Sequence, residues 1–165
     1  MPAPRPVPAD HDHAHCIDDA LGKAAELCVR RGARLTRLRR RVLELVWQGH
    51  SAVKAYDLLE MLAREDRSAR PPTIYRALDF LMAHGLVHRL ESLNAYIGCP
   101  QPEASHEGQF LICEGCGWVG EFEALEIQAA ITDQATDQGF AVDQQTVEVR
   151  GTCRRCLAGP AMERG

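Results

Sequence analysis

Two Cys-x-x-Cys pairs carry the most specific chemistry in the sequence. One pair lies in CEGC and the other in CRRC, and together they supply four thiols: Cys113, Cys116, Cys153 and Cys156. Two tight turns that bring four thiolates together match the tetrahedral all-sulfur ligand set of structural Zn²⁺. Redox motifs or disulfides are the alternatives, but a redox motif should open a helix, whereas Gly115 and Gly117 punctuate a turn. We therefore predict a structural zinc site.

The segment from His88 to Glu121 adds further metal-binding residue types and separates two halves of opposite charge. It contains two histidines and three cysteines. Residues 1–90 contain 15 Lys and Arg against 11 Asp and Glu, whereas residues 91–165 contain 4 against 12. A basic first half favours a polyanionic partner for that half alone, although a chance imbalance of surface charge is the alternative.

Length and composition restrict the class of protein. The 165 residues, 45% apolar and 25% charged, suit one good core or two small ones. No apolar run approaches the ~20 residues of a membrane span, and the first residues lack the apolar core of a secretory signal. We therefore expect a cytoplasmic protein with no membrane partner. In that reducing compartment, seven cysteines favour metal ligation over disulfides.

Residues 1–16 are predicted to be a disordered arm. The first ten residues contain four prolines and no periodic apolar pattern. The motif HDHAHC at residues 11–16 then gathers three histidines and a cysteine. It is either a weak accessory metal patch or a tail without the fixed geometry that zinc requires.

Residues 17–98 are predicted to be mostly helical. An apolar stripe that includes Cys28 indicates a first helix, which Gly32 ends, and Cys28 is interpreted as a core residue rather than a ligand. Thr36 is predicted to cap a second helix, and Ser51 precedes a third. Five arginines surround the start of the second helix, and they favour phosphate contact over a merely solvated face: Arg34, Arg37, Arg39, Arg40 and Arg41.

A fourth helix begins at the Pro-Pro pair of residues 71–72, where missing N–H groups cost little. Its apolar residues recur at helical spacing from Ile74 to Leu81, which leaves Tyr75 and Arg76 facing outward. Two short strands follow, and helices followed by a hairpin are the layout of a winged helix-turn-helix. Its recognition helix would present the arginine to guanine acceptors and the tyrosine ring to a thymine methyl group or a sugar.

The rest of the chain reads as a linker and a second, small module. Residues 99–107 have the composition of a hinge, residues 108–157 form an α/β module, and residues 158–165 are a tail. Strands are expected over residues 108–113, 117–123 and 140–151, with a helix over residues 123–138. A module of this size needs a metal to stabilise its limited core.

Several segments together resemble the ferric uptake regulator family, and most closely its zinc uptake regulator branch. They are RLTRLRRRVL, AYDLL, PPTIYRALDFL, GLVHRLES, NAYIGC, FLICEGCG and CRRC. The resemblance covers about residues 18–157. It implies an α+β protein with an N-terminal winged helix and a C-terminal dimerisation domain that carries the four-cysteine zinc knuckle. It also implies a homodimeric, zinc-loaded repressor that binds A/T-rich palindromic operators of zinc-acquisition genes and takes no small-molecule substrate.

The resemblance also implies roles for individual residues. The four cysteines match the structural zinc ligands, and a second, regulatory zinc per protomer is matched by His88, Cys99, His106 and Glu121. Tyr75 and Arg76 match DNA-contacting residues. With them we expect contacts to operator DNA from Thr73, Arg34, Arg37, Arg40 and Tyr56.

Two departures from the family pattern matter. Arg37 stands where many members have proline, which changes the cap of the second helix. The His-rich segment that iron-type members carry before the first Cys-x-x-Cys pair is replaced by SHEGQF. Because the regulatory set offers two nitrogens, one sulfur and one oxygen, its thiolate favours zinc over iron(II) or manganese.

Other function classes stay as alternatives. An iron- or peroxide-responsive regulator of the same family is one of them. A zinc-dependent hydrolase is a second, but a catalytic zinc needs an open position for water, and four protein ligands would leave none. A zinc-ribbon interaction module is a third, and the outward Tyr75–Arg76 pair argues against it. We expect no enzyme activity.

Overall fold

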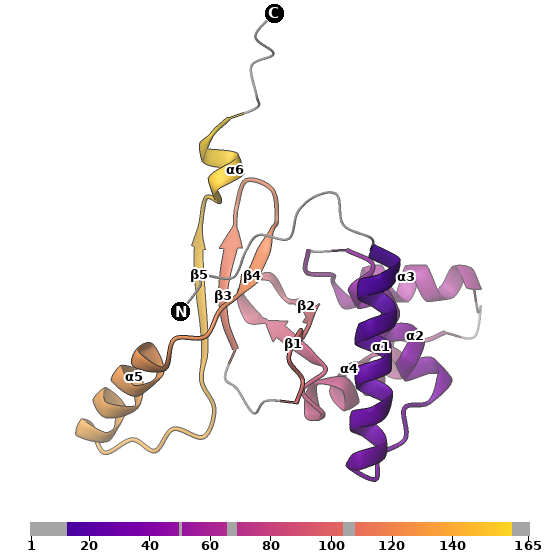
Figure 1. Cartoon of the computed structure of the whole chain (residues 1–165), viewed down its shortest axis with the longest axis horizontal. Helices are drawn as coiled ribbons and strands as arrows, with labels where there is room; N and C mark the ends of the chain where they lie inside the picture. Colours follow the sequence, from indigo (N-terminus) through magenta and orange to yellow (C-terminus); the bar gives the residue numbers. More distant parts are fainter. Residues whose placement is uncertain (1–12, 50, 66–68, 104–107, 160–165) are drawn as a thin grey trace, which may run out of the picture. The chain divides into compact units, whose positions relative to one another are not determined.

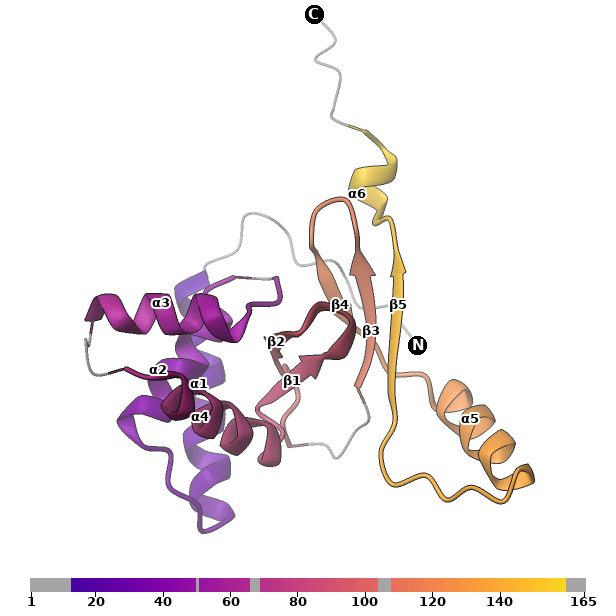
Figure 2. The ribbon, with the colours of Figure 1, turned by 180° about the vertical axis from the view of Figure 1, so that it is seen from behind.

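The computed structural model describes residues 13–49, 51–65, 69–103 and 108–159, which divide into two compact units. The N-terminal unit contains the described residues up to Glu103, and the C-terminal unit those from Gly108 onward. Each unit has its own secondary structure (Figures 1 and 2).

The N-terminal unit consists of four helices and an antiparallel hairpin (Figure 1). Its elements are α1 (His13–Arg30), α2 (Arg37–Trp47), α3 (Ala55–Glu65), α4 (Pro71–Ala83), β1 (Val87–Leu90), a 3₁₀ turn (Glu91–Leu93) and β2 (Ala95–Gly98). In the hairpin, Val87 pairs with Gly98 and Leu90 with Ala95. Asn94 closes the turn with a φ of 46°, a left-handed conformation that asparagine tolerates better than most residues. The winged helix-turn-helix prediction is confirmed.

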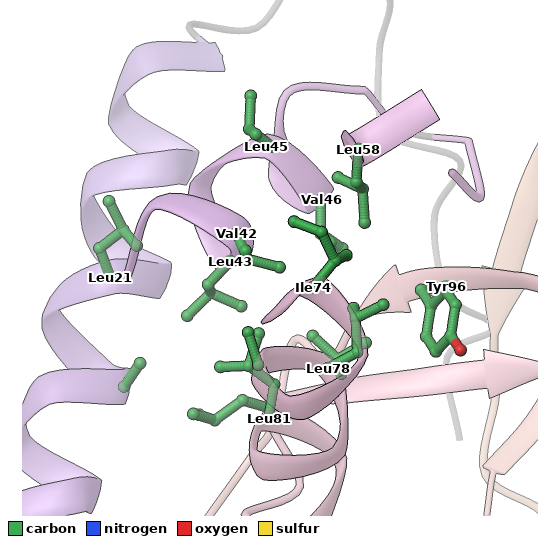
Figure 3. Packing of buried hydrophobic residues seen from close by; sticks show 14 of the residues in the cluster. Leu21, Val42, Leu43, Leu45, Val46, Leu58, Ile74, Leu78, Leu81 and Tyr96 are labelled. Carbon is green, nitrogen blue, oxygen red and sulfur yellow. The ribbon is translucent and has the colours of Figure 1, made fainter. Parts of the chain in front are cut away.

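The core of this unit lies where α1, α2, α3, α4 and β2 meet (Figure 3). Thr36 caps α2 as predicted, since its hydroxyl accepts a hydrogen bond from the Arg39 backbone N–H. On α4 the buried stripe is Ile74, Ala77, Leu78 and Leu81, and burying each large member contributes about 1.5–3 kcal/mol. Because this stripe occupies one face of α4, the opposite face is left to solvent.

Three details differ from the sequence-based expectations. Helix α1 begins at His13, so the predicted disordered arm loses its last four residues to the helix. Ser51 does not start α3, which begins at Ala55, because the intervening chain is held by a bridge between Val53 and Tyr96. The first residues of the predicted hinge are also attached to this unit: Cys99 N donates to Leu86 O at 3.0 Å.

The C-terminal unit contains a three-stranded sheet, in the order β4-β3-β5, and two helices (Figure 2). Its elements are β3 (Gly108–Cys113), β4 (Val119–Glu121), α5 (Leu125–Asp137), β5 (Thr146–Gly151) and α6 (Arg154–Leu157). β3 pairs antiparallel with β4 and parallel with β5. Both outer strands are shorter than predicted.

Helix α5 forms close to the predicted range, but none of its residues is buried within the described chain. Leu125 is 61% exposed, and Ile127 and Ile131 are each 39% exposed. The structure therefore confirms the predicted helix and shows that its apolar residues face outward within the described chain. In the described chain, no helix combines the length and apolar character needed to cross a lipid bilayer.

Candidate metal centres and nucleic-acid interface

The four predicted structural zinc ligands come together at one end of the C-terminal sheet. Cys113 ends β3, Cys116 follows in the next turn, and Cys153 and Cys156 lie at the start of α6 and within it. One sulfur from each residue lies within 4.8 Å of the other three. The parallel pairing of β3 with β5 causes this meeting, since Cys113 is opposite Gly151 and Cys153 follows two residues later.

The sulfur geometry fits zinc better than a disulfide between Cys116 and Cys153. Cys116 Sγ and Cys153 Sγ are 3.7 Å apart. Zn–S bonds of about 2.3 Å in a tetrahedron place sulfurs roughly 3.8 Å apart, whereas a disulfide needs about 2.05 Å. Gly115 keeps the turn tight, because a Cβ atom added there would lie 3.1 Å from Cys156 Sγ.

Hydrogen bonds prepare this cluster to hold thiolates. The backbone N–H of Cys153 donates to Cys113 Sγ at 3.2 Å and, with other backbone donors, lowers the pKa of Cys113 to about 6. A backbone hydrogen bond at Trp118, with help from Arg155, lowers the pKa of Cys116. Hydrogen bonds to the neighbouring cysteine sulfurs raise the pKa of Cys156 to about 12. A divalent cation can replace the protons that these closely spaced sulfurs share, so the cluster is suited to bind one.

A second pair of metal-binding atoms lies in the N-terminal unit. His88 is on β1, and Cys99 directly follows β2 on the neighbouring strand of the hairpin. Their ligand atoms lie within 4.8 Å of each other, and the Cys99 residue is only 3% exposed. The hairpin register, with His88 opposite Ile97, accounts for this proximity. The wing therefore offers one nitrogen and one sulfur to a metal.

The other two predicted regulatory ligands are placed differently. Glu121 is the last residue of β4 in the C-terminal unit, where it is half-buried. His106 lies outside the described residues. The full set of four ligands therefore stays a prediction.

The predicted DNA contacts on α4 are all exposed. Thr73, Tyr75 and Arg76 lie on the face of the helix opposite the buried stripe, and Tyr75 is 50% exposed. Among the described residues, Arg76 makes no ion pair or side-chain hydrogen bond. Tyr56 on α3 is 67% exposed, and a hydrogen bond with Glu60 raises the pKa of its phenol.

The arginine run divides into two groups. Arg39 donates to Arg34 O at 2.7 Å and stacks 3.6 Å from the centroid of the Phe80 ring, so it joins α2 to α4. Arg41 pairs with Glu44 at 2.8 Å and with Glu65, which lowers the pKa of the Glu65 carboxyl. The prediction that all five arginines favour phosphate therefore needs correction, because these two have structural partners within the unit.

The remaining arginines of the run are Arg34, Arg37 and Arg40. All three side chains are exposed, and none forms an ion pair with any part of the chain that the structure describes. They keep their charge available for a polyanion.

Two supporting residues were missed by the sequence interpretation. Arg155 hydrogen-bonds Cys116, which raises the arginine pKa. Trp47, the last residue of α2, lies against Gly98 beside Cys99. The position of Arg155 inside CRRC was a usable clue, whereas nothing local to Trp47 indicates a partner so distant in the chain.

Comparison with known proteins places these features in a family. The family model described as the ferric uptake regulator family matches residues 30–150. The zinc uptake regulation protein of Escherichia coli is 39% identical over 142 residues, which cover 84% of this chain and 82% of that protein. That of Mycobacterium tuberculosis is 30% identical over 128 residues, which cover 76% of this chain and 95% of that protein.

Solved structures of zinc uptake regulators are also similar to this chain. A zinc uptake regulator complexed with zinc and DNA is similar with a TM-score of 0.83 and 37% identity, over 86% of this chain and 95% of that chain. Holo XcZur is similar with a TM-score of 0.79 and 42% identity, over 86% of this chain and 99% of that chain.

Proposed function

This chain belongs to the ferric uptake regulator family, and from that premise we propose that it is a zinc-responsive transcriptional repressor. Zinc acts as the corepressor: each protomer of a homodimer holds one structural and one regulatory zinc. The loaded dimer binds palindromic operators of zinc-uptake genes. When zinc is scarce, the regulatory ion leaves and repression ends.

The observation that carries this proposal is the pair formed by His88 and Cys99 on the wing. It places a nitrogen and a sulfur ligand, within 4.8 Å of each other, in the unit that carries the exposed α4 face. A borderline-soft cation such as Zn²⁺ suits this pair better than a cation that prefers oxygen. We assign His106 and Glu121 as the partners that complete the shell.

The proposed DNA interface rests on exposure and charge. Arg76 and Tyr75 read base edges from α4, and Thr73 contacts the backbone at the start of that helix. Phosphate contacts come from Arg34, Arg37 and Arg40, with Tyr56 beside them on α3. The structural partners of Arg39 and Arg41 keep α2 and its N-terminal arginines in a fixed position relative to α4 and α3.

Exposed apolar surface on the C-terminal unit supports the homodimer. No residue of α5 is buried, and Phe140 and Val149 are 66% and 47% exposed. A stable protein rarely leaves this much apolar surface to water unless a partner covers it. Ile131→Glu should dissociate the dimer in analytical ultracentrifugation, whereas Glu126→Gln on the same helix should not.

The test of the proposed function is operator binding by the full-length chain. Fluorescence anisotropy on a promoter fragment from a zinc-uptake gene should show tight binding with zinc and weak binding after chelation of the exchangeable ion. Cys99→Ser should abolish most of the zinc response, and the control Cys28→Ala should retain it. An unchanged zinc response in Cys99→Ser would overturn the regulatory assignment.

The two alternatives predict different results in the same assay. An iron- or peroxide-responsive regulator would bind the operator better with Fe²⁺ than with Zn²⁺ or release it on addition of hydrogen peroxide. A zinc-dependent hydrolase would cleave ester or amide substrates and show no zinc-dependent DNA binding. The thiolate in the ligand set favours the zinc response.

A further inference from the structure

The indole of Trp118 covers the strand that ends in the proposed zinc ligand Glu121. Strand β4 runs from Val119 to Glu121, and a Cβ atom on its middle residue, Gly120, would overlap the Trp118 ring. Glycine is required at this position by the close approach of the ring, since the φ of Gly120 is not positive. Side chains two residues apart lie on the same face of a strand, so the indole folds along β4. The ring therefore limits how the backbone before Glu121 can move.

The backbone of Trp118 is attached to the candidate zinc knuckle. Its carbonyl accepts a hydrogen bond from Cys113 N at 2.8 Å. A backbone hydrogen bond from Trp118 to Cys116 lowers the pKa of that thiol. Both cysteines belong to the knuckle, so the start of β4 is tied to the knuckle geometry. Trp118 thus joins the knuckle to the strand that ends at Glu121.

Gln109 holds the chain on the other side of Glu121. This glutamine on β3 is 2% exposed, and burying a polar side chain is costly unless it forms hydrogen bonds. Its backbone carbonyl accepts a hydrogen bond from Phe122 N at 2.9 Å, and its side-chain amide donates to Ala124 O at 3.1 Å. Both partners follow Glu121 closely in the chain. The segment after the ligand is therefore attached to β3.

We propose that Trp118 and Gln109 are positioning residues that hold Glu121 in place for regulatory zinc. This inference deepens the proposed function and rests on Glu121 being a zinc ligand. A ligand whose backbone is already fixed loses less conformational entropy when it binds the metal, so the affinity is higher. Partners that contact a metal ligand directly contribute about 10–100-fold to metal affinity. Because Trp118 and Gln109 act through the backbone, we expect an effect at the lower end of that range.

The test is the zinc affinity of the regulatory site in full-length protein whose knuckle is already loaded with zinc. Competition with a chromophoric chelator should show that Trp118→Leu weakens this affinity about tenfold. Trp118→Phe keeps an aromatic ring over Gly120 and should lose less. Both variants should retain the knuckle zinc, because the backbone contacts of Trp118 remain. Phe140→Leu, the same kind of change at an exposed position outside both candidate metal centres, should match the parent.

A double-mutant cycle with Glu121→Gln separates positioning from general stability. Trp118→Leu should cause no further loss of zinc affinity once Glu121→Gln has removed the carboxylate. Gln109→Met, which removes the amide that donates to Ala124 O, should behave in the same way. An equal loss in both backgrounds would overturn the positioning role, because Trp118 would then act by another route.

The remaining outcomes separate this inference from the proposed function. If Glu121→Gln weakens zinc binding but Trp118→Leu does not, only the positioning role is wrong. Loss of the knuckle zinc in Trp118→Leu would also overturn it, since Trp118 would then serve the knuckle itself. If Glu121→Gln alone leaves the zinc affinity unchanged, the ligand assignment in the proposed function is wrong, and the positioning role fails with it.

Discussion

The indole of Trp47 lies on the backbone of Gly98, at a position where any Cβ atom would overlap the ring. Trp47 is the last residue of α2, the helix that carries the exposed arginines, and Gly98 precedes Cys99. Glycine is required here by close approach rather than by an unusual backbone conformation, since the φ of Gly98 is not positive. The contact links the arginine-bearing helix to the strand that leads to a proposed zinc ligand.

Gly98→Ala should therefore weaken zinc binding at Cys99. The added methyl group must displace Trp47 or the end of β2, and overpacking of this kind typically costs about 1–3 kcal/mol. Competition with a chromophoric chelator would measure the loss of zinc affinity. Gly49→Ala is the matched control, because its Cβ atom would lie at an ordinary 3.5 Å from the Ser51 hydroxyl. Equal zinc affinity in both variants would show that the contact is irrelevant to the site.

Loss of one knuckle ligand should unfold the C-terminal unit. In small zinc modules the metal contributes on the order of 10 kcal/mol to folding, and this unit buries few apolar side chains of its own. Cys153→Ser should therefore lose both its tightly held zinc and the dimer, as measured by metal content and sedimentation velocity. Thr152→Ser, a conservative change at the adjacent residue, should keep both the zinc and the dimer. A stable Cys153→Ser dimer with normal melting would refute the knuckle.

Arg76 and Arg40 should differ in how they affect DNA binding. If Arg76 contacts a base, Arg76→Ala should cost about 1–3 kcal/mol on the operator and relax the preference at one position. If Arg40 contacts phosphate, Arg40→Ala should weaken all sequences alike and reduce the salt dependence by about one ion. Lys23→Ala on α1 is the charge-matched control. Equal losses on operator and random DNA for Arg76→Ala would exclude base reading.

The sequence predicted the N-terminal elements well because their signals are local. The stripe from Ile74 to Leu81 and the two strands of the hairpin depend on residues close in the chain, and both appear as expected. The bridge between Val53 and Tyr96 is different, since it joins distant segments and overrides the capping preference of Ser51. Helix α5 shows the converse limit: its pattern predicted a helix but not whether the apolar residues would be buried.

The candidate sites were likewise predictable only where their sequence signals are local. The two Cys-x-x-Cys motifs identified the knuckle ligands from the sequence alone, because each motif holds two sulfurs close together. Only the approach of one motif to the other depends on the fold. The pairing of His88 with Cys99 needed the family resemblance, as neither residue is distinctive alone. Sequence spacing could not distinguish Arg40, which forms no ion pair in the described chain, from Arg41, which does. The ion pair between Arg41 and Glu65 depends on how α2 packs against α3.

His84 should make the stability of the N-terminal unit sensitive to pH. Burial lowers the pKa of His84 below its usual 6.5, and Arg31 and Arg39 lower it further. Between that lowered pKa and 6.5 the unfolded chain binds more protons than the folded chain. The contribution of neutral His84 to the stability of the folded unit is therefore fully present above this pH range and is lost as the pH falls through it.

His84→Gln should flatten this dependence in urea unfolding followed at several pH values between about 7.5 and 5. Arg31→Gln should also flatten it, because it removes one nearby positive charge, although it deletes the bond from Arg31 to His84 O as well. The comparison uses Cys99→Ser protein throughout, which separates this effect from the proton dependence of regulatory zinc. A slope that His84→Gln leaves unchanged would assign the acid sensitivity to other groups.

Operator DNA should tighten zinc binding as much as zinc tightens operator binding. If regulatory zinc favours the DNA-binding state ~100-fold, it contributes about 2.7 kcal/mol to operator affinity, and linkage requires the reverse effect to be equal. Zinc transfer to a chelator should therefore be ~100-fold less favourable when operator DNA is present, and unaffected by DNA of scrambled sequence. Cys99→Ser should lose this coupling while it keeps the knuckle zinc and the dimer. If operator DNA leaves the zinc affinity of the parent unchanged, zinc binding and DNA binding are independent, and the metal at His88 and Cys99 stabilises the wing without regulating it.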